Sequence, residues 1–258
     1  MILTRLDDYQ SWQVSHAGSC LLIDPWLTAD PITGSFDRRH DGMYADLRSI
    51  QSGGLDVAAI LLCTSVNDHL RPDTLRAMPD TPVLGTRASA RLARRLGCRD
   101  ARAVQPGDTH SFDCRDGGRL VVTATRTGLP LGIIAIGWLV EAYDISGAAA
   151  GRLWIEPHQP TRSTAAALAP LDVAILPAES VTAVVLPVTA RPQAAAEAAA
   201  AARARRVVPT ATDPRRDMST WQRSAYRVRG GISHLGDALA PGIELTTLAA
   251  GESVALTA

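Results

Sequence analysis

An apolar run at 57–62 passes directly into a short polar loop, and the pattern beyond it changes to that of a helix. Pro72 suits the first turn of that helix because a proline there lacks only an N–H that would have no partner. A rigid strand that feeds such a loop is where α/β proteins commonly place chemistry. Asp68 and His69 stand side by side in the loop and are therefore the first candidate site residues.

Elsewhere, apolar residues at every second position predict strands, and apolar residues at every third or fourth position predict helices. Strands are expected at 11–16, 19–24, 82–85, 102–104, 110–114, 119–126, 133–143, 152–155, 173–176, 207–209, 243–247 and 253–256. Helices are expected at 87–96, 163–168 and 192–206, with one or two more in 219–239. The strands between 102 and 155 are interpreted as one β-meander, and 27–54 as a long loop. Two halves with strands first and helices after indicate two sheets face to face with helices outside.

The composition argues against several classes of protein. The 258 residues contain no linker-like segment, which favours a single domain spanning 1–258. The formal net charge is zero, so no excess positive charge favours a nucleic-acid partner. Apolar runs no longer than a strand, and acidic residues near the start, argue against membrane association and a signal peptide, so a cytoplasmic location is expected. The zero charge also permits self-association, and a homodimer is the expected assembly.

Several motifs resemble those of the metallo-β-lactamase fold superfamily. They are LLIDPWL at 21–27, LLCTSVNDHLRPDTL at 61–75, LWIEPH at 153–158 and RRVVPT at 205–210. Within the superfamily, the chain is most similar to a plant and cyanobacterial-type branch with DDHxH and EPH motifs. The resemblance implies an α/β fold, a four-layer αββα sandwich of two mixed sheets with a metal site at one edge.

The metal-ligand motif is degenerate. Where the superfamily has HxHxDH, this chain has Thr64 and Val66 in place of the first two histidines, and only Asp68 and His69 remain. The next histidine, expected at 126–130, is missing, and Thr210-Ala211-Thr212 stands where the last is expected. The resemblance therefore does not support a dinuclear centre here.

A smaller site is compatible with what remains. The resemblance places His158 at or next to the superfamily's bridging acid, so Asp68, His69 and His158 are predicted to hold one Zn²⁺, Fe²⁺ or Mn²⁺. Bound water would then become acidic enough to attack an ester, lactone or thioester. Glu156 is a candidate catalytic base beside Asp68 and His69, and Asp213 is a second choice for orienting the water.

Two residues near the first hairpin complete the predicted site. Asp24 and Trp26 are expected at the mouth, where they would contact a substrate, and Asp24 could instead fix a ligand histidine from behind. Each residue also has a plainer structural role: Asp24 in a turn, Trp26 in the core, His158 in a turn, and Asp68 as a helix cap.

Three functions stay open on this sequence. The first is a hydrolase of a small molecule with at most one metal. The second is a metal-independent cyclase, isomerase or lyase in small-molecule biosynthesis, in which Asp68, His69, Glu156 or His158 transfers a proton. The third is a non-catalytic binding protein that keeps only the scaffold. Metal content separates the first from the other two.

Overall fold

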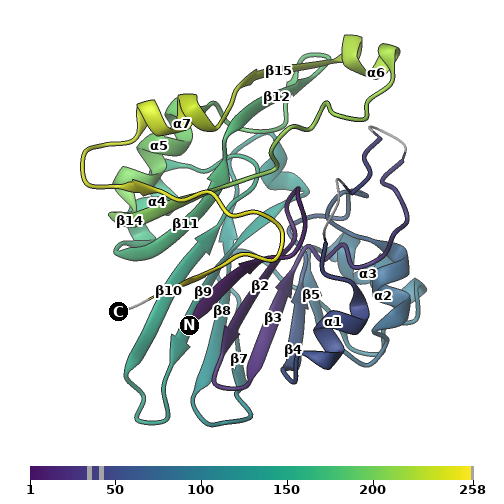
Figure 1. Ribbon diagram of the computed structural model, residues 1–258, viewed down its shortest axis with the longest axis vertical. Coiled ribbons are helices and arrows are strands. Elements are labelled where there is room, and N and C mark those ends of the chain that lie inside the picture. The colour runs from purple at the N-terminus through teal and green to yellow at the C-terminus, as the bar shows by residue number, and fades with distance from the viewer. Residues whose placement is uncertain (34–36, 41–43, 257–258) are drawn as a thin grey trace.

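Two large β-sheets lie face to face with helices on their outer faces, which gives four layers (Figure 1). The structure is a computed structural model and describes residues 1–33, 37–40 and 44–256. The first sheet comprises, in spatial order, β17 (Ser253–Ala255), β1 (Ile2–Arg5), β2 (Trp12–His16), β3 (Ser19–Ile23), β4 (Asp56–Leu61), β5 (Val83–Gly85) and β6 (Ala101–Ala103). Its first four strands pair antiparallel, and β3 to β6 pair parallel.

The second sheet is also mixed. It comprises β16 (Glu244–Leu245), β14 (Ala204–Thr210), β11 (Leu171–Pro177), β10 (Ala149–Ile155), β9 (Ile136–Tyr143), β8 (Arg119–Arg126) and β7 (Thr109–Asp113). The run from β7 to β10 is an antiparallel meander, whereas β10, β11, β14 and β16 are parallel. The expected αββα sandwich of two mixed sheets is confirmed.

Alternate residues of both sheets meet in a central apolar core. Leu3, Trp12 and Leu21 enter it from the first sheet, and Trp138 and Val208 enter it from the second, all without exposed surface. Side chains on a strand point alternately to its two faces, so the residues between these positions face the helical layers.

The helices form one outer layer on each sheet. The first sheet is covered by α1 (Leu47–Ser52), α2 (Pro72–Ala77) and α3 (Arg87–Arg95). The second is covered by α4 (Arg162–Leu168), α5 (Pro192–Ala201) and α7 (Ile232–Ala238), while α6 (Thr220–Ala225) lies apart (Figure 1). Four buried alanines of α5 pack on the second sheet, and their small side chains let the helix approach it closely.

A third, small sheet stands over one edge of the sandwich. Its strands, in spatial order, are β13 (Leu186–Pro187), β12 (Glu179–Ala183) and β15 (Tyr226–Gly230). The carboxyl ends of β3, β4, β10, β11 and β14 point toward this edge, as Figure 1 shows. Loops that follow parallel strands are therefore gathered beneath the small sheet.

Several sequence-based predictions differ from the structure. The predicted strand at 102–104 is β6 and extends the first sheet parallel to β5, so it is not part of the meander. The predicted long loop contains α1, whose N-cap Asp46 accepts a hydrogen bond from the Ser49 N–H. Residues 34–36 and 41–43 of that loop lie outside the described ranges.

The region after β14 contains a strand that the sequence did not predict. One or two helices were expected in 219–239, and two are present, α6 and α7. The strand β15 between them was not predicted; its arginines alternate with apolar residues, and Gly230 at its end has a positive φ. The sequence pattern also missed β1, β12 and β13, which are short or only partly buried. Among the described residues, no helix is long and apolar enough to cross a membrane.

Candidate active site

Asp24 and His69 form a buried hydrogen-bonded pair at the head of the first sheet. Asp24 follows β3 directly, and its Oδ1 accepts the backbone N–H of Cys63 at 2.8 Å. Its Oδ2 lies 2.7 Å from Nδ1 of His69. Burial alone would lower the pKa of His69, but the carboxylates of Asp24 and Asp68 raise it to about 9. The imidazole is therefore charged at neutral pH, and its Nε2 is left for a contact other than Asp24.

Asp68 stands on the other side of the same imidazole. Its Oδ2 lies 3.6 Å from Nε2 of His69. The Gln10 amide donates to the Asp68 backbone carbonyl at 2.7 Å and to Oδ2 at 3.3 Å, which ties this loop to the segment between β1 and β2. His69 is thus held between two carboxylates, of which one is deeply buried and the other faces a cavity.

His158 approaches from the second sheet. Its ring centroid lies 4.7 Å from that of His69, and its Nδ1 is buried without a hydrogen-bond partner. Burial, together with the positive charge of His69, lowers the pKa of His158 well below its usual value. One neutral and one charged imidazole therefore lie side by side.

Glu156 is enclosed behind His158 and has no exposed surface. Its Oε1 accepts the backbone N–H groups of His158 and Gln159 at 3.0 and 3.3 Å, and the Thr127 hydroxyl donates to Oε2 at 2.5 Å. Burial raises the pKa of Glu156 to about 7 in spite of these hydrogen bonds. The carboxyl group therefore shapes the turn that presents His158 to the cavity.

The site opens into a cavity of about 240 Å³. Asp68, His69 and His158 are among its lining residues, and most of the remaining lining is apolar. At the mouth, Ile134 and Leu186 line the cavity and are 48% and 47% exposed. The other lining residues are Tyr9, Gln10, Val66, Leu131, Pro157, Val181, Val188, Thr189, Ala211, Pro214, Met218 and Tyr226. Such a pocket suits a small molecule with an apolar body.

The structure brings Asp68, His69 and His158 together, although they come from opposite sheets. Asp24 contacts His69 from behind, the second arrangement that the sequence had suggested for it. Trp26 is not among the cavity-lining residues; it is buried, and its indole N–H donates to the Asp30 carbonyl at 2.9 Å.

Two further candidates also lie off the cavity wall. Glu156 and Asp213 are both absent from the lining, and the Asp213 N–H donates to Glu179. Sequence reasoning missed Gln10 and Tyr9, which line the cavity but follow no motif that signals a site.

Threonines stand at three positions where the family resemblance leads us to expect histidines. The hydroxyl group of each threonine is hydrogen-bonded within the protein. Thr64 donates to the Ile134 carbonyl at 3.0 Å, and Thr127 donates to Glu156. Thr210 accepts the Trp12 indole N–H at 3.2 Å. These hydroxyl groups are engaged within the protein, so a dinuclear metal centre does not fit here.

The one compact group of potential ligands does not suit a single ion, and a single-ion site made of Asp68, His69 and His158 stays a prediction. In the described ranges, the one group of three side chains with ligand atoms all within 4.8 Å of one another is Asp24, Cys63 and His69. Asp24 and His69 are directly hydrogen-bonded at 2.7 Å, which leaves no room for an ion between them. Burial and the nearby Asp24 carboxylate raise the pKa of the Cys63 thiol far above its usual value, so the thiolate ligand is disfavoured.

Comparison with solved structures shows the same fold over nearly the whole chain. An isothiocyanate hydrolase from Delia radicum gut bacteria is 17% identical, with a TM-score of 0.67 and coverage of 100% of this chain and 99% of that one. The metallo hydrolase Igni18 from Ignicoccus hospitalis is 15% identical, with a TM-score of 0.67 and coverage of 98% and 97%. CmlA, a diiron β-hydroxylase from Streptomyces venezuelae, is 16% identical, with a TM-score of 0.63 and coverage of 99% and 54%.

Comparison with curated protein sequences gave no match. A family model described as a beta-lactamase superfamily domain matches residues 6–211, which is most of the chain. Its boundaries take in Asp24, Asp68, His69 and His158. This protein therefore belongs to the beta-lactamase superfamily.

Proposed function

We propose that this protein is a hydrolase that acts, without a resident metal, on a small and largely apolar ester, lactone or thioester. The observation that carries the proposal is the placement of His69 between the carboxylates of Asp24 and Asp68 at the wall of an apolar cavity. A charged imidazole next to a carboxylate supplies a proton donor and a proton acceptor within one small site.

In this reaction Asp68 acts as general base and His69 as general acid. Asp68 accepts a proton from a water molecule while the water oxygen forms a bond to the acyl carbon. His69 donates its Nε2 proton to the leaving oxygen or sulfur as the bond from that atom to the acyl carbon breaks. The proton held on Asp68 then returns to His69, and the products are a carboxylic acid and an alcohol or thiol. Asp24 keeps the imidazole charged and correctly oriented throughout.

The cavity supports an apolar acyl group. Val66, Leu131 and Val188 are among its lining residues, and the half-exposed Ile134 and Leu186 extend the apolar surface to the mouth. Similarity to an isothiocyanate hydrolase and a metallo hydrolase agrees with a hydrolytic reaction, but at such low identity it shows the fold alone, so the reaction rests on the site.

A second candidate is a metal-independent lyase or isomerase that uses the same residues. The observation that favours it is the burial of the two imidazoles at the cavity, where His69 is 2% exposed and His158 is 4% exposed, so that a bound substrate would cover what remains of their surface. In that reaction Asp68 would take a proton from carbon and His69 would return it to another atom of the same substrate.

The test is a panel of p-nitrophenyl esters, lactones, acyl thioesters and an isothiocyanate, assayed with and without a chelator. We expect hydrolysis of at least one class, no effect of the chelator, and less than about 0.1 metal ion per chain. Asp68→Asn and His69→Gln should each lower kcat by roughly a hundredfold or more, whereas Asp73→Asn, at a partly exposed position on α2, should not.

Two results would overturn the proposal. One is activity that the chelator abolishes and a divalent ion restores, which would return Asp68, His69 and His158 to the role of metal ligands. The other is full activity in both variants. If no compound in the panel is hydrolysed but Asp68→Asn abolishes the binding or conversion of a carbon acid, the second candidate holds.

A further inference from the structure

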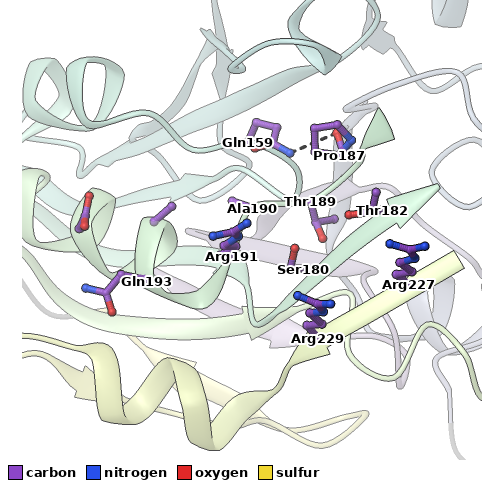
Figure 2. Close-up of a pocket in the computed structure, with 12 residues that line it drawn as sticks. Gln159, Ser180, Thr182, Pro187, Thr189, Ala190, Arg191, Gln193, Arg227 and Arg229 are labelled. Atoms are coloured by element: carbon purple, nitrogen blue, oxygen red, sulfur yellow. Dashed lines mark hydrogen bonds between the residues drawn. The ribbon is translucent and has the colours of Figure 1, made fainter. Parts of the chain in front are cut away.

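A second cavity lies on the opposite side of the small sheet. Its volume is about 530 Å³, which is within the range of small-molecule sites. The residues that line it are Gln159, Ser180, Thr182, Pro187, Thr189, Ala190, Arg191, Gln193, Ala194, Glu197, Arg227 and Arg229. Figure 2 shows Arg227 and Arg229 on β15 and Arg191 at the start of α5, in the wall of this cavity.

Strand register explains why the polar groups gather on this face. Ser180 on β12 pairs with Arg229 on β15, and Thr182 pairs with Arg227. Residues two apart on a strand share a face, so these four side chains form one polar patch. Val181, between the two hydroxyl residues, points the other way and lines the candidate active site. The ribbon of β12 and β15 is thus a wall common to both cavities.

The charge of this second cavity is unbalanced. Arg191, Arg227 and Arg229 are exposed, and no ion pair or hydrogen bond of their side chains is found in the described part of the chain. Glu197 is the single carboxylate among the twelve lining residues. Three guanidinium groups with one acid leave a net positive surface, which favours an anionic ligand.

The start of α5 adds donors to the same cavity. This ten-residue helix has no side-chain cap at its N-cap Arg191. The backbone N–H groups of Gln193 and Ala194 lie in its first turn, where no helical carbonyl can accept them, and both residues line the cavity. Uncapped N–H groups and the helix dipole attract the same ligand as the arginines.

We propose that this cavity binds the phosphate groups of a small, multiply charged phosphate compound. Guanidinium groups bind phosphate through paired N–H donors, and the Ser180 and Thr182 hydroxyls add further donors. At about 30 Å³ per liquid water molecule, the cavity has room for much more than one phosphate group. A diphosphate, free or as part of an organic ester, therefore suits it better than inorganic phosphate.

The test is calorimetric titration of the full chain with inorganic phosphate, pyrophosphate, a nucleoside diphosphate, succinate and a short single-stranded oligonucleotide. Pyrophosphate or the nucleoside diphosphate should bind most tightly, and the stronger of the two identifies the source of the phosphate groups. Arg227→Gln and Arg229→Gln should each weaken that binding by roughly tenfold or more. Arg91→Gln, at an exposed position on α3, is the matched control and should leave the affinity unchanged.

Binding to the unaltered protein provides a second measurement that does not depend on variants. The affinity for pyrophosphate should fall steeply as sodium chloride is added, because the contacts are ionic. Absence of binding at millimolar pyrophosphate overturns the proposal, as does equal weakening by Arg91→Gln. Tighter binding of succinate, or of a short single-stranded oligonucleotide, overturns the assignment to a small phosphate compound. None of these measurements uses hydrolytic activity, so they are independent of the function proposed for the other cavity.

Discussion

Replacement of Glu156 by glutamine should change how the stability of the protein depends on pH. Burial raises the pKa of this carboxyl group from 4.5 to about 7. A raised pKa in the folded state means that folding favours the protonated acid. The stabilisation is fully present below pH 4.5 and is lost as the pH rises through 7.

The size of this effect follows from the same values. One pKa unit corresponds to about 1.4 kcal/mol, so the free energy of unfolding should fall by about 3 kcal/mol across this window because of Glu156. Glutamine cannot ionise, and its Oε1 can still accept the N–H groups of His158 and Gln159 while its amide faces Thr127. Glu156→Gln should therefore equal the unaltered protein near pH 4.5 and exceed it by a few kcal/mol near pH 8.

Urea denaturation between pH 4.5 and 8 measures the difference directly. Glu197→Gln is a suitable control, because Glu197 is exposed on α5 and should show no such pH dependence. A difference between Glu156→Gln and the unaltered protein that stays constant with pH, or that has the opposite sign, would refute the reasoning. The slope of unfolding free energy against urea concentration should be the same in all three proteins.

Three further predictions concern the candidate active site. The pKa of His69 is raised to about 9, so hydrolysis that needs its charged form should stay constant up to about pH 8 and decline above pH 9. A pH–rate profile measures this. The stability that the charged imidazole contributes should be fully present below pH 6.5 and lost as the pH rises through 9. Asp24→Asn should lower the pKa of His69 and cost roughly 3 kcal/mol of stability or more, and an NMR titration that still gives a pKa near 9 would contradict this. Leu186→Glu at the mouth should raise KM for long acyl chains but not for acetyl esters, whereas Val185→Glu, which is 86% exposed and does not line the cavity, should leave KM unchanged.

Local sequence patterns were sufficient to predict many of the strands and helices. The apolar run at 57–62 predicted β4, the polar residues after it predicted the site loop, and Pro72 predicted the start of α2. Each of these signals depends on only a few neighbouring residues. The missing histidines at Thr64 and Thr210 were likewise visible in the sequence. Only the folded structure showed that the hydroxyl groups of these two threonines are already hydrogen-bonded within the protein.

The sequence by itself determined the sandwich, the loop that carries Asp68 and His69, and the loss of the usual ligands. Only the tertiary structure decided that Asp24 supports His69, that Glu156 lies behind His158, and that β12 and β15 separate an apolar cavity from an arginine-lined one. Short strands such as β15 gain their stability from pairing with a distant segment rather than from their own residues. A contact of that kind depends on the folded arrangement of both partners, so no local pattern along the chain could reveal it.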